Sequence, residues 1–362
     1  METKNDTKEE ILCITFSFNN KLFAVGTNKG FKVYTANPLS LEITRNLQGG
    51  IGLIEMLEVS NIMLLGGGGS NPCYALNKLI VWDDNTLSEA KELCFEKDIK
   101  GAKIFRKFII VTCENEITIF NSNYEKIIYN KITNDKGIFT VTQDPENPIM
   151  VAFPYKNVSD IKIYKLQETN NNNDNLNLSE TTLENIHANK IALLSFSYDG
   201  KYLATASENG TVIRVFLLDE QTKKVGEFRR GKNAAHIYSI TFNKDALVLG
   251  TCSDTGTAHI FKIDPKKFCP IDAILKNKTS FFGAVTNLDL TSYLNTQINS
   301  YFCSEWSFQK FNMKNNVTTK IGFPENDVVV AVNYNGDYVS GKINFQNNCL
   351  FINVETSIFL ES

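Results

Sequence analysis

A repeat of short β-rich segments is the feature that most restricts the fold of this chain. A phenylalanine precedes a glycine by 14 residues three times: Phe16 and Gly30, Phe196 and Gly210, Phe242 and Gly256. Each glycine follows a small polar turn and precedes a β-branched and aromatic segment, such as 211–216 or 257–261. The last two units are offset by 46 residues, from Ser207 to Ser253. A strand, hairpin turn and strand that recur about every 40–45 residues are typical of propeller blades.

The remaining sequence agrees with a single all-β domain. Apolar segments are short and separated by Asn, Asp and Gly clusters, as in 109–120 and 328–335. The 25 Phe and 13 Tyr residues supply the bulk that packed sheets need. Seven blades require roughly 300 residues on this period, which leaves about 60 of the chain for insertions. We therefore predict that residues 1–362 form one seven-bladed β-propeller of the WD40-like type.

Two segments are predicted to be insertions. Residues 167–182 contain an Asn-rich, low-complexity run, and we expect a surface loop with no function there. Residues 264–300 begin with lysines and become apolar, as expected of a loop on the propeller rim that contacts a membrane. In that case Phe281, Phe282 and Val285 are the contact residues. The alternative is that these apolar residues cover a blade edge, and the sequence leaves both open.

Charge and cysteine content restrict the location and the partners. A formal net charge of -3 argues against broad nucleic-acid binding. The polar N-terminus, 1–10, lacks the apolar core of a signal peptide, and no apolar stretch reaches membrane-spanning length. The eight cysteines form no CxxC pair and are predicted to be reduced core residues. We expect a cytoplasmic monomer whose membrane contact is peripheral.

Two adjacent arginines, Arg229 and Arg230, lie between the last two repeat units. Successive side chains of an extended segment point to opposite sides, so the pair would serve two pockets, one with each neighbouring repeat. Guanidinium groups bind phosphate through a rigid donor fork, and Ser and Thr hydroxyls can complete the oxygen shell. We expect both arginines to project into open pockets rather than into the core. Taken alone, Ser207 and Ser253 would be hairpin caps and His259 a structural residue, so the prediction depends on the whole constellation.

The segments around the arginine pair resemble the PROPPIN family of phosphoinositide-binding, seven-bladed propellers (the Atg18 and WIPI proteins). The resemblance is carried by segments 203–216, 228–231, 237–240, 253–261 and 301–308, and segment 66–84 is similar to the WIPI-three/four branch. It implies two phosphoinositide sites. The first would consist of His187, Ser207, Thr211, Arg214 and Arg229, and the second of Arg230, Ser253, Thr255, Thr257 and His259.

The function implied by this resemblance is that of a non-enzymatic effector. It would bind phosphatidylinositol 3-phosphate and phosphatidylinositol 3,5-bisphosphate on autophagic, endosomal or vacuolar membranes and recruit autophagy or vesicle-traffic machinery. The family also implies an Atg2-type lipid-transfer partner that docks around 72–82. The alternative is a WD-type scaffold that binds peptides and no lipid. The three histidines lack metal-ligand spacing, and there is no nucleophile elbow or Walker loop, so we expect no enzyme activity, metal or cofactor.

Overall fold

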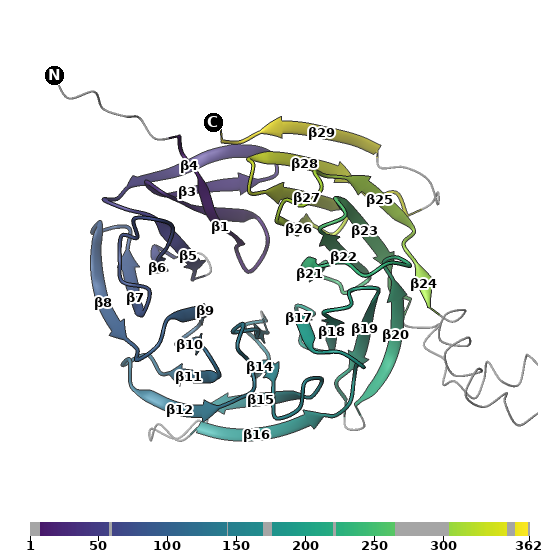
Figure 1. Ribbon diagram of the computed structural model, residues 1–362, viewed down its shortest axis with the longest axis horizontal. Helices are drawn as coiled ribbons and strands as arrows, with labels where there is room; N and C mark the ends of the chain where they lie inside the picture. The colour runs from purple at the N-terminus through teal and green to yellow at the C-terminus, as the bar shows by residue number, and fades with distance from the viewer. Residues whose placement is uncertain are drawn as a thin grey trace, which may run out of the picture.

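Seven β-sheets stand as blades around a central axis in the computed structural model of the chain (Figure 1). The structure describes residues 8–57, 60–142, 144–168, 176–219, 222–264, 304–345 and 352–360. The blades begin at β1, β5, β9, β13, β17, β21 and β26, and these strands lie nearest the axis. The predicted all-β, seven-bladed propeller is therefore confirmed.

The strands of the first four blades follow one another in chain order. They are β1 (Ile11–Phe16), β2 (Leu22–Thr27), β3 (Gly30–Ala36) and β4 (Leu39–Asn46); β5 (Ile51–Met56), β6 (Ile62–Gly67), β7 (Lys78–Asp83) and β8 (Ser88–Cys94); β9 (Ile99–Phe105), β10 (Phe108–Cys113), β11 (Glu116–Phe120) and β12 (Lys126–Lys131); and β13 (Thr140–Val141), β14 (Ile149–Pro154), β15 (Ile161–Glu168) and β16 (Leu176–Leu183).

The fifth and sixth blades depart from this simple order. The strands of the last three blades are β17 (Ile191–Phe196), β18 (Tyr202–Ser207), β19 (Val212–Leu217), β20 (Lys223–Arg229) and β24 (Glu305–Trp306); β21 (Ile237–Phe242), β22 (Val248–Ser253), β23 (Thr257–Lys262) and β25 (Gln309–Asn312); and β26 (Thr319–Glu325), β27 (Val328–Asn333), β28 (Asp337–Lys342) and β29 (Ile352–Ile358). The segment after residue 303 thus adds a fifth strand to blade five before it completes blade six. The resemblance indicated a strand in segment 301–308, but not that it would join blade five.

The recurring phenylalanine and glycine have a structural explanation. The phenylalanine ends the innermost strand of its blade, and the glycine lies at the turn before the third strand. Gly30, Gly210 and Gly256 all adopt positive φ, which side chains other than hydrogen disfavour. At Gly210, for example, an added Cβ would lie 1.9 Å from the carbonyl oxygen of Ala235. The repeat therefore marks hairpin geometry.

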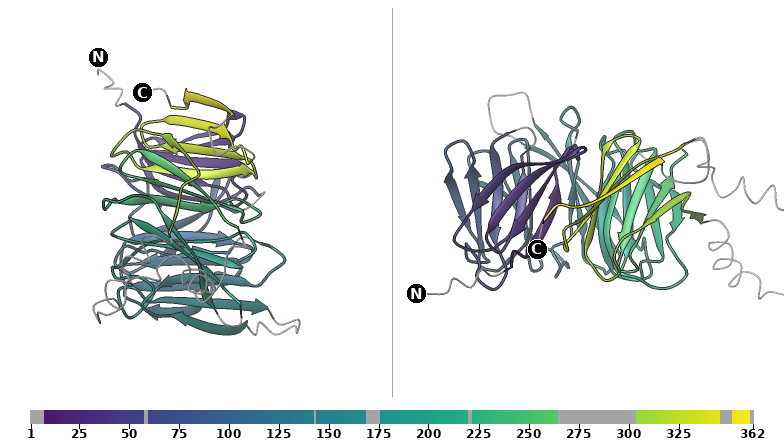
Figure 2. Two further views of the ribbon diagram at one scale, coloured as in Figure 1. Left: turned by 90° about the vertical axis from the view of Figure 1, so that its right-hand side faces the viewer. Right: turned by 90° about the horizontal axis from the view of Figure 1, so that it is seen from above.

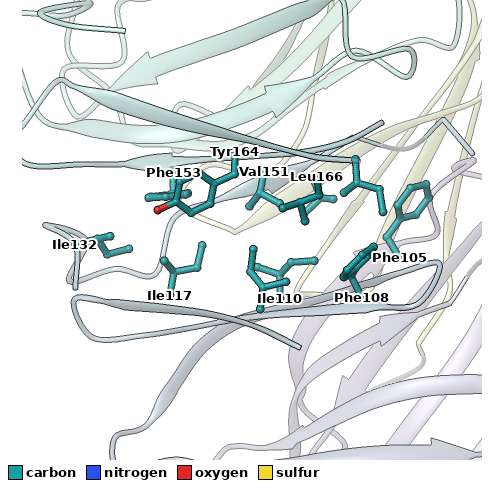
Figure 3. Packing of buried hydrophobic residues seen from close by; sticks show 12 residues of the cluster. Phe105, Phe108, Ile110, Ile117, Ile132, Val151, Phe153, Tyr164 and Leu166 are labelled. Carbon is teal, nitrogen blue, oxygen red and sulfur yellow. The ribbon is translucent and has the colours of Figure 1, made fainter. Parts of the chain in front are cut away.

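Apolar side chains between neighbouring blades form the core. Between blades three and four, Phe105, Phe108 and Ile110 pack in one cluster with Phe153 and Tyr164 (Figure 3). The last two rings meet edge-on with centroids 5.0 Å apart. Because each fully buried side chain of this size contributes about 1.5–3 kcal/mol, such contacts hold the blades in place.

The ring closes by side-chain packing between the first and last blades, which lie side by side (Figures 1 and 2). Strands β1 to β4 and β26 to β29 form two separate sheets, so no strand is exchanged between them. Ile14 and Val25 pack with Val330 across this seam. The Tyr338 hydroxyl also donates a 2.7 Å hydrogen bond to the carbonyl oxygen of Ala36.

The two predicted insertions have different outcomes. Strands β15 and β16 pair from Ile161 with Leu183 to Glu168 with Leu176, so residues 167–168 and 176–182 are strand and not loop. The expected loop boundaries were too wide because the Asn-rich composition hid the alternation of β16. Residues 265–300, with Phe281, Phe282 and Val285, lie outside the described residues, and their membrane contact stays a prediction.

The burial of the described cysteines agrees only in part with the prediction that they are core residues. Cys13, Cys113 and Cys252 are buried, but Cys73 is partly exposed and Cys94 is exposed. Cys94 lies at the end of β8, an outer strand with mostly exposed side chains.

Among the described residues, no helix is long and apolar enough to cross a membrane.

Candidate anion-binding site between blades five and six

The arginine pair lies at the end of β20, on the outer part of blade five. Arg229 pairs with Val212 of β19 on one side and, in parallel, with Trp306 of β24 on the other. The backbone N–H of Arg230 donates to the carbonyl oxygen of Thr211 at 2.9 Å. The hairpin and the added strand therefore fix the backbone of both arginines.

Both arginine side chains are buried, which corrects the expectation of open pockets. Arg229 is 9% exposed and Arg230 is 5% exposed. The Nε of Arg229 donates to Ser304 Oγ at 2.8 Å, and the Nε of Arg230 donates to the carbonyl oxygen of Gly210 at 2.9 Å. Buried donors need partners, so neutral oxygens of the protein bind these guanidinium groups.

The two arginines have different surroundings, as their alternation along the strand predicts. The Nε of Arg229 reaches Ser304, in the segment that precedes β24. Arg230 spans two blades, because its Nη1 also donates to Thr255 Oγ1 of blade six at 3.4 Å and its Nη2 to the carbonyl oxygen of Asn233 at 2.5 Å. Burial lowers the pKa of Arg230 below its usual value, although the nearby Asp254 opposes this shift.

Most of the residues predicted for the second site lie close together. Ser253 and Thr255 share a hydrogen bond of 2.9 Å between their hydroxyl oxygens, next to Arg230. His259 is bonded through Nδ1 to Ser307 Oγ at 3.0 Å. Burial lowers the pKa of His259 to about 4, and the charge of Arg230 contributes to this shift. The remaining residue, Thr257, begins β23 and is half-buried.

In the first predicted set, Arg214 and His187 lie near each other. Arg214 donates from Nε to Glu227 Oε2 at 2.9 Å and from Nη1 to the carbonyl oxygen of Ile186. His187 is hydrogen-bonded through Nε2 to Thr205 Oγ1 at 2.8 Å. Burial and the charge of Arg214 together lower the pKa of His187 to about 3.

Ser207 and Thr211 occupy the turn between β18 and β19. Ser207 is buried at the end of β18, and Thr211 Oγ1 accepts a 3.3 Å hydrogen bond from Asn209. Arg229 pairs with Val212, the residue after Thr211, but its Nε donates to Ser304. The structure therefore gathers the first set around one edge of blade five without joining all of its members.

Three further residues near the site were not predicted. Glu227 binds Arg214, and although burial opposes its ionisation, Lys224 and Arg214 hold the pKa of its carboxyl below the usual value. Asp254 Oδ2 accepts from the backbone of His236 at 3.1 Å, and its buried Oδ1 has no hydrogen-bond partner among the described residues. Ser304 binds Arg229. Glu227 could have been found from the register of the β19–β20 hairpin, where it lies opposite Arg214.

Open space adjoins the backbone next to the arginine pair. A Cβ built on Gly231 would meet no atom within 4 Å. Thr255, on the blade-six side, is exposed to solvent. An anion that entered here could accept from Arg230 and from the Thr255 hydroxyl.

The central channel is a second candidate region. A cavity of about 540 Å³ lies there, and Glu55 is the acidic residue of its lining. Burial raises the pKa of Glu55 against the attraction of Lys103, whose Nζ lies 2.6 Å from it. Among the described residues, no group of three or more His, Cys, Asp and Glu side chains is placed to hold a metal ion. The channel lining thus combines one carboxylate with four lysines, Lys100, Lys103, Lys136 and Lys320, and the arginine pair lies apart from it, on the outer part of blade five.

Known proteins resemble the chain over most of its length. The sequence model of one family, described as PROPPIN, matches residues 11–323. Autophagy-related protein 18 of Dictyostelium discoideum is 35% identical over 263 residues, which cover 71% of this chain and 66% of the relative. Autophagy-related protein 18e of Arabidopsis thaliana is 27% identical over 99% of this chain and 90% of its own length. SVP1-like protein 2 of Neurospora crassa is 29% identical over 70% of this chain, and the match spans 56% of that relative.

Solved structures share the fold. Kluyveromyces lactis Hsv2 superposes with a TM-score of 0.72 and 22% identity, over 96% of this chain and 99% of that chain. KlAtg21, solved in a complex with the coiled-coil of AgAtg16, superposes with a TM-score of 0.69 and 20% identity, over 96% and 99% of the two chains. At these identities the likeness concerns the arrangement of the blades.

Proposed function

The chain belongs to the PROPPIN family of autophagy-related, non-enzymatic β-propeller effectors, and from this premise we propose that it binds 3-phosphoinositides through the residues around Arg229 and Arg230. The ligands would be phosphatidylinositol 3-phosphate and phosphatidylinositol 3,5-bisphosphate. Bound to them, the protein would sit on the surface of autophagic, endosomal or vacuolar membranes and recruit autophagy or vesicle-traffic machinery.

The observation that carries this proposal is the position of Arg230. Its guanidinium group contacts blade five at Gly210 and blade six at Thr255, and open space adjoins Gly231. The present acceptors are neutral oxygens. A phosphate group carries about -1.5 to -2 charges, so it would add the attraction of an opposite charge to hydrogen bonds that the guanidinium now makes to neutral acceptors. A phosphoinositide head group would therefore compete well for the same donors.

A finer part of the proposal concerns a protein partner. An Atg2-type lipid-transfer protein would dock on blade two around 72–82, a segment that includes β7. Similarity of segment 66–84 to the WIPI-three/four branch supports this part. The competing function is a peptide-binding scaffold, which would not need the arginine pair with its hydroxyl-bearing neighbours.

The decisive experiment replaces both arginines, Arg229→Thr with Arg230→Thr. We expect the variant to lose co-sedimentation with liposomes that contain phosphatidylinositol 3-phosphate. Because both side chains are buried and hydrogen-bonded, we also expect a loss of stability of about 1–3 kcal/mol. A matched control is Arg45→Thr in blade one, which breaks the ion pair of Arg45 with Asp84. This control should still bind the liposomes.

Calorimetry with a soluble head group, inositol 1,3-bisphosphate, separates two sites from one. Wild-type protein should bind two head groups per chain, and Arg229→Thr or Arg230→Thr alone should leave one. A wild-type stoichiometry of one would contradict the two-site proposal. Continued sedimentation of the double variant, or an equal loss in Arg45→Thr, would favour the scaffold instead.

A further inference from the structure

We propose that Trp306 is a membrane anchor that places its indole in the interfacial layer of a phospholipid bilayer, beside the head group bound at Arg229. This inference rests on the proposed function and adds an apolar contact to it. The anchor lies among the described residues, in β24, and is separate from the predicted contact of 264–300.

The inference is based on the position of Trp306 next to Arg229 in the sheet, and not on its exposure alone. The residue is 51% exposed, but single exposed apolar side chains are common on protein surfaces. What distinguishes Trp306 is that it pairs directly with Arg229 in the sheet of blade five. Strand β24 is the outermost strand there, beyond β20 (Figure 1). A head group at Arg229 would thus bring the membrane surface within reach of the indole.

Contacts on both sides hold the backbone of Trp306 in place. Ser304 accepts from Arg229 at 2.8 Å, and Ser307 is hydrogen-bonded to His259 at 3.0 Å. The backbone N–H of Phe308 then donates to the carbonyl oxygen of Ile260 at 2.9 Å. One short segment therefore touches a residue of each predicted site, and Trp306 lies between these contacts. An anchor that is already ordered loses little conformational entropy on binding.

The chemistry of the indole suits a lipid interface. Trp combines a large apolar ring with one N–H donor and is enriched where membranes meet water. The neighbouring Glu305 is exposed as well, and successive strand residues point to opposite sides. The charge of Glu305 would thus point away from the bilayer that Trp306 contacts, so Glu305→Gln should leave binding to anionic liposomes close to that of wild type.

The test compares Trp306→Ala with Leu41→Ala. Leu41 is equally exposed, at 51%, but lies in blade one. With phosphatidylcholine liposomes that contain phosphatidylinositol 3-phosphate, Trp306→Ala should bind roughly tenfold more weakly, because the apolar area of the ring is lost. Leu41→Ala should bind like wild type. Both variants should bind inositol 1,3-bisphosphate as wild type does.

A second measurement needs no change at Trp306. The chain contains two tryptophans, and Trp82 is only 7% exposed. In Trp82→Phe the remaining fluorescence reports Trp306, and its emission should shift to shorter wavelength with these liposomes and be quenched by brominated lipid. Soluble head group should produce neither effect.

The outcomes separate the two proposals. If wild-type protein binds neither head group nor liposomes, the proposed function and the anchor are both overturned. If head-group binding persists while Trp306→Ala sediments like wild type and the Trp82→Phe emission stays unshifted, the anchor alone is overturned. An equal loss of head-group and liposome binding in Trp306→Ala would also contradict the anchor, because it would indicate a change in the site itself.

Discussion

His187 and His259 are uncharged bases at neutral pH, since their pKa values are lowered to about 3 and about 4. Burial is the main cause in both, and a neighbouring arginine adds to it. The unfolded chain, with histidine pKa values of about 6.5, binds protons in the range where the folded protein does not. The contribution of these two histidines to the free energy of unfolding is therefore fully present above about pH 6.5. It is lost as the pH falls toward their pKa values in the folded protein, about 3 and about 4.

We expect the free energy of unfolding to fall with decreasing pH by up to about 1.4 kcal/mol per pH unit for each histidine in this range. Urea unfolding at several pH values measures the slope. His187→Gln and His259→Gln should each reduce it. Parallel pH profiles for wild type and both variants would refute the assignment.

At the scale of elements, the β15–β16 hairpin is paired on both sides of the Asn-rich segment. The two strands remain paired up to Glu168 and Leu176, so register is set before the connection begins. We expect that replacing residues 169–175 by an Asn-Gly turn leaves liposome binding unchanged. Because closure of a shorter loop costs less entropy, the unfolding midpoint should stay the same or rise slightly.

Thermal unfolding and co-sedimentation of this shortened protein test the expectation. Loss of binding without loss of stability would assign the Asn-rich segment a role in recognition. A large drop in the midpoint would instead mean that residues 169–175 support the hairpin.

At the scale of the whole molecule, the ring depends on side chains at the seam between the first and last blades. The hydroxyl of Tyr338 donates to a buried carbonyl of Ala36 there. Tyr338→Phe should lower the free energy of unfolding by about 1–2 kcal/mol, because the carbonyl loses its partner. Head-group affinity should be unchanged, since the arginine pair lies between blades five and six. Tyr129→Phe, at a 45% exposed position in blade three, should change stability by less than about 0.5 kcal/mol.

The sequence by itself determined the class of the fold and the location of the arginine pair. Blade period, turn glycines such as Gly210 and strand alternation are local properties, because a hairpin forms between neighbouring residues. The pairing of Arg214 with Glu227 is also local, since the two lie opposite each other in one hairpin. These features can be read along the chain.

Only the tertiary structure decided how the site is closed. Ser304 lies 75 residues from Arg229 in the chain, and Thr255 lies 25 residues from Arg230 in another blade. Burial of the two guanidinium groups follows from these contacts and not from the motif. The addition of β24 to blade five likewise depends on where the chain returns after residue 303. Such contacts form between segments that the fold brings together. The family resemblance placed Thr255 in one site with Arg230, but no local pattern of residues indicated the contact of Ser304 with Arg229.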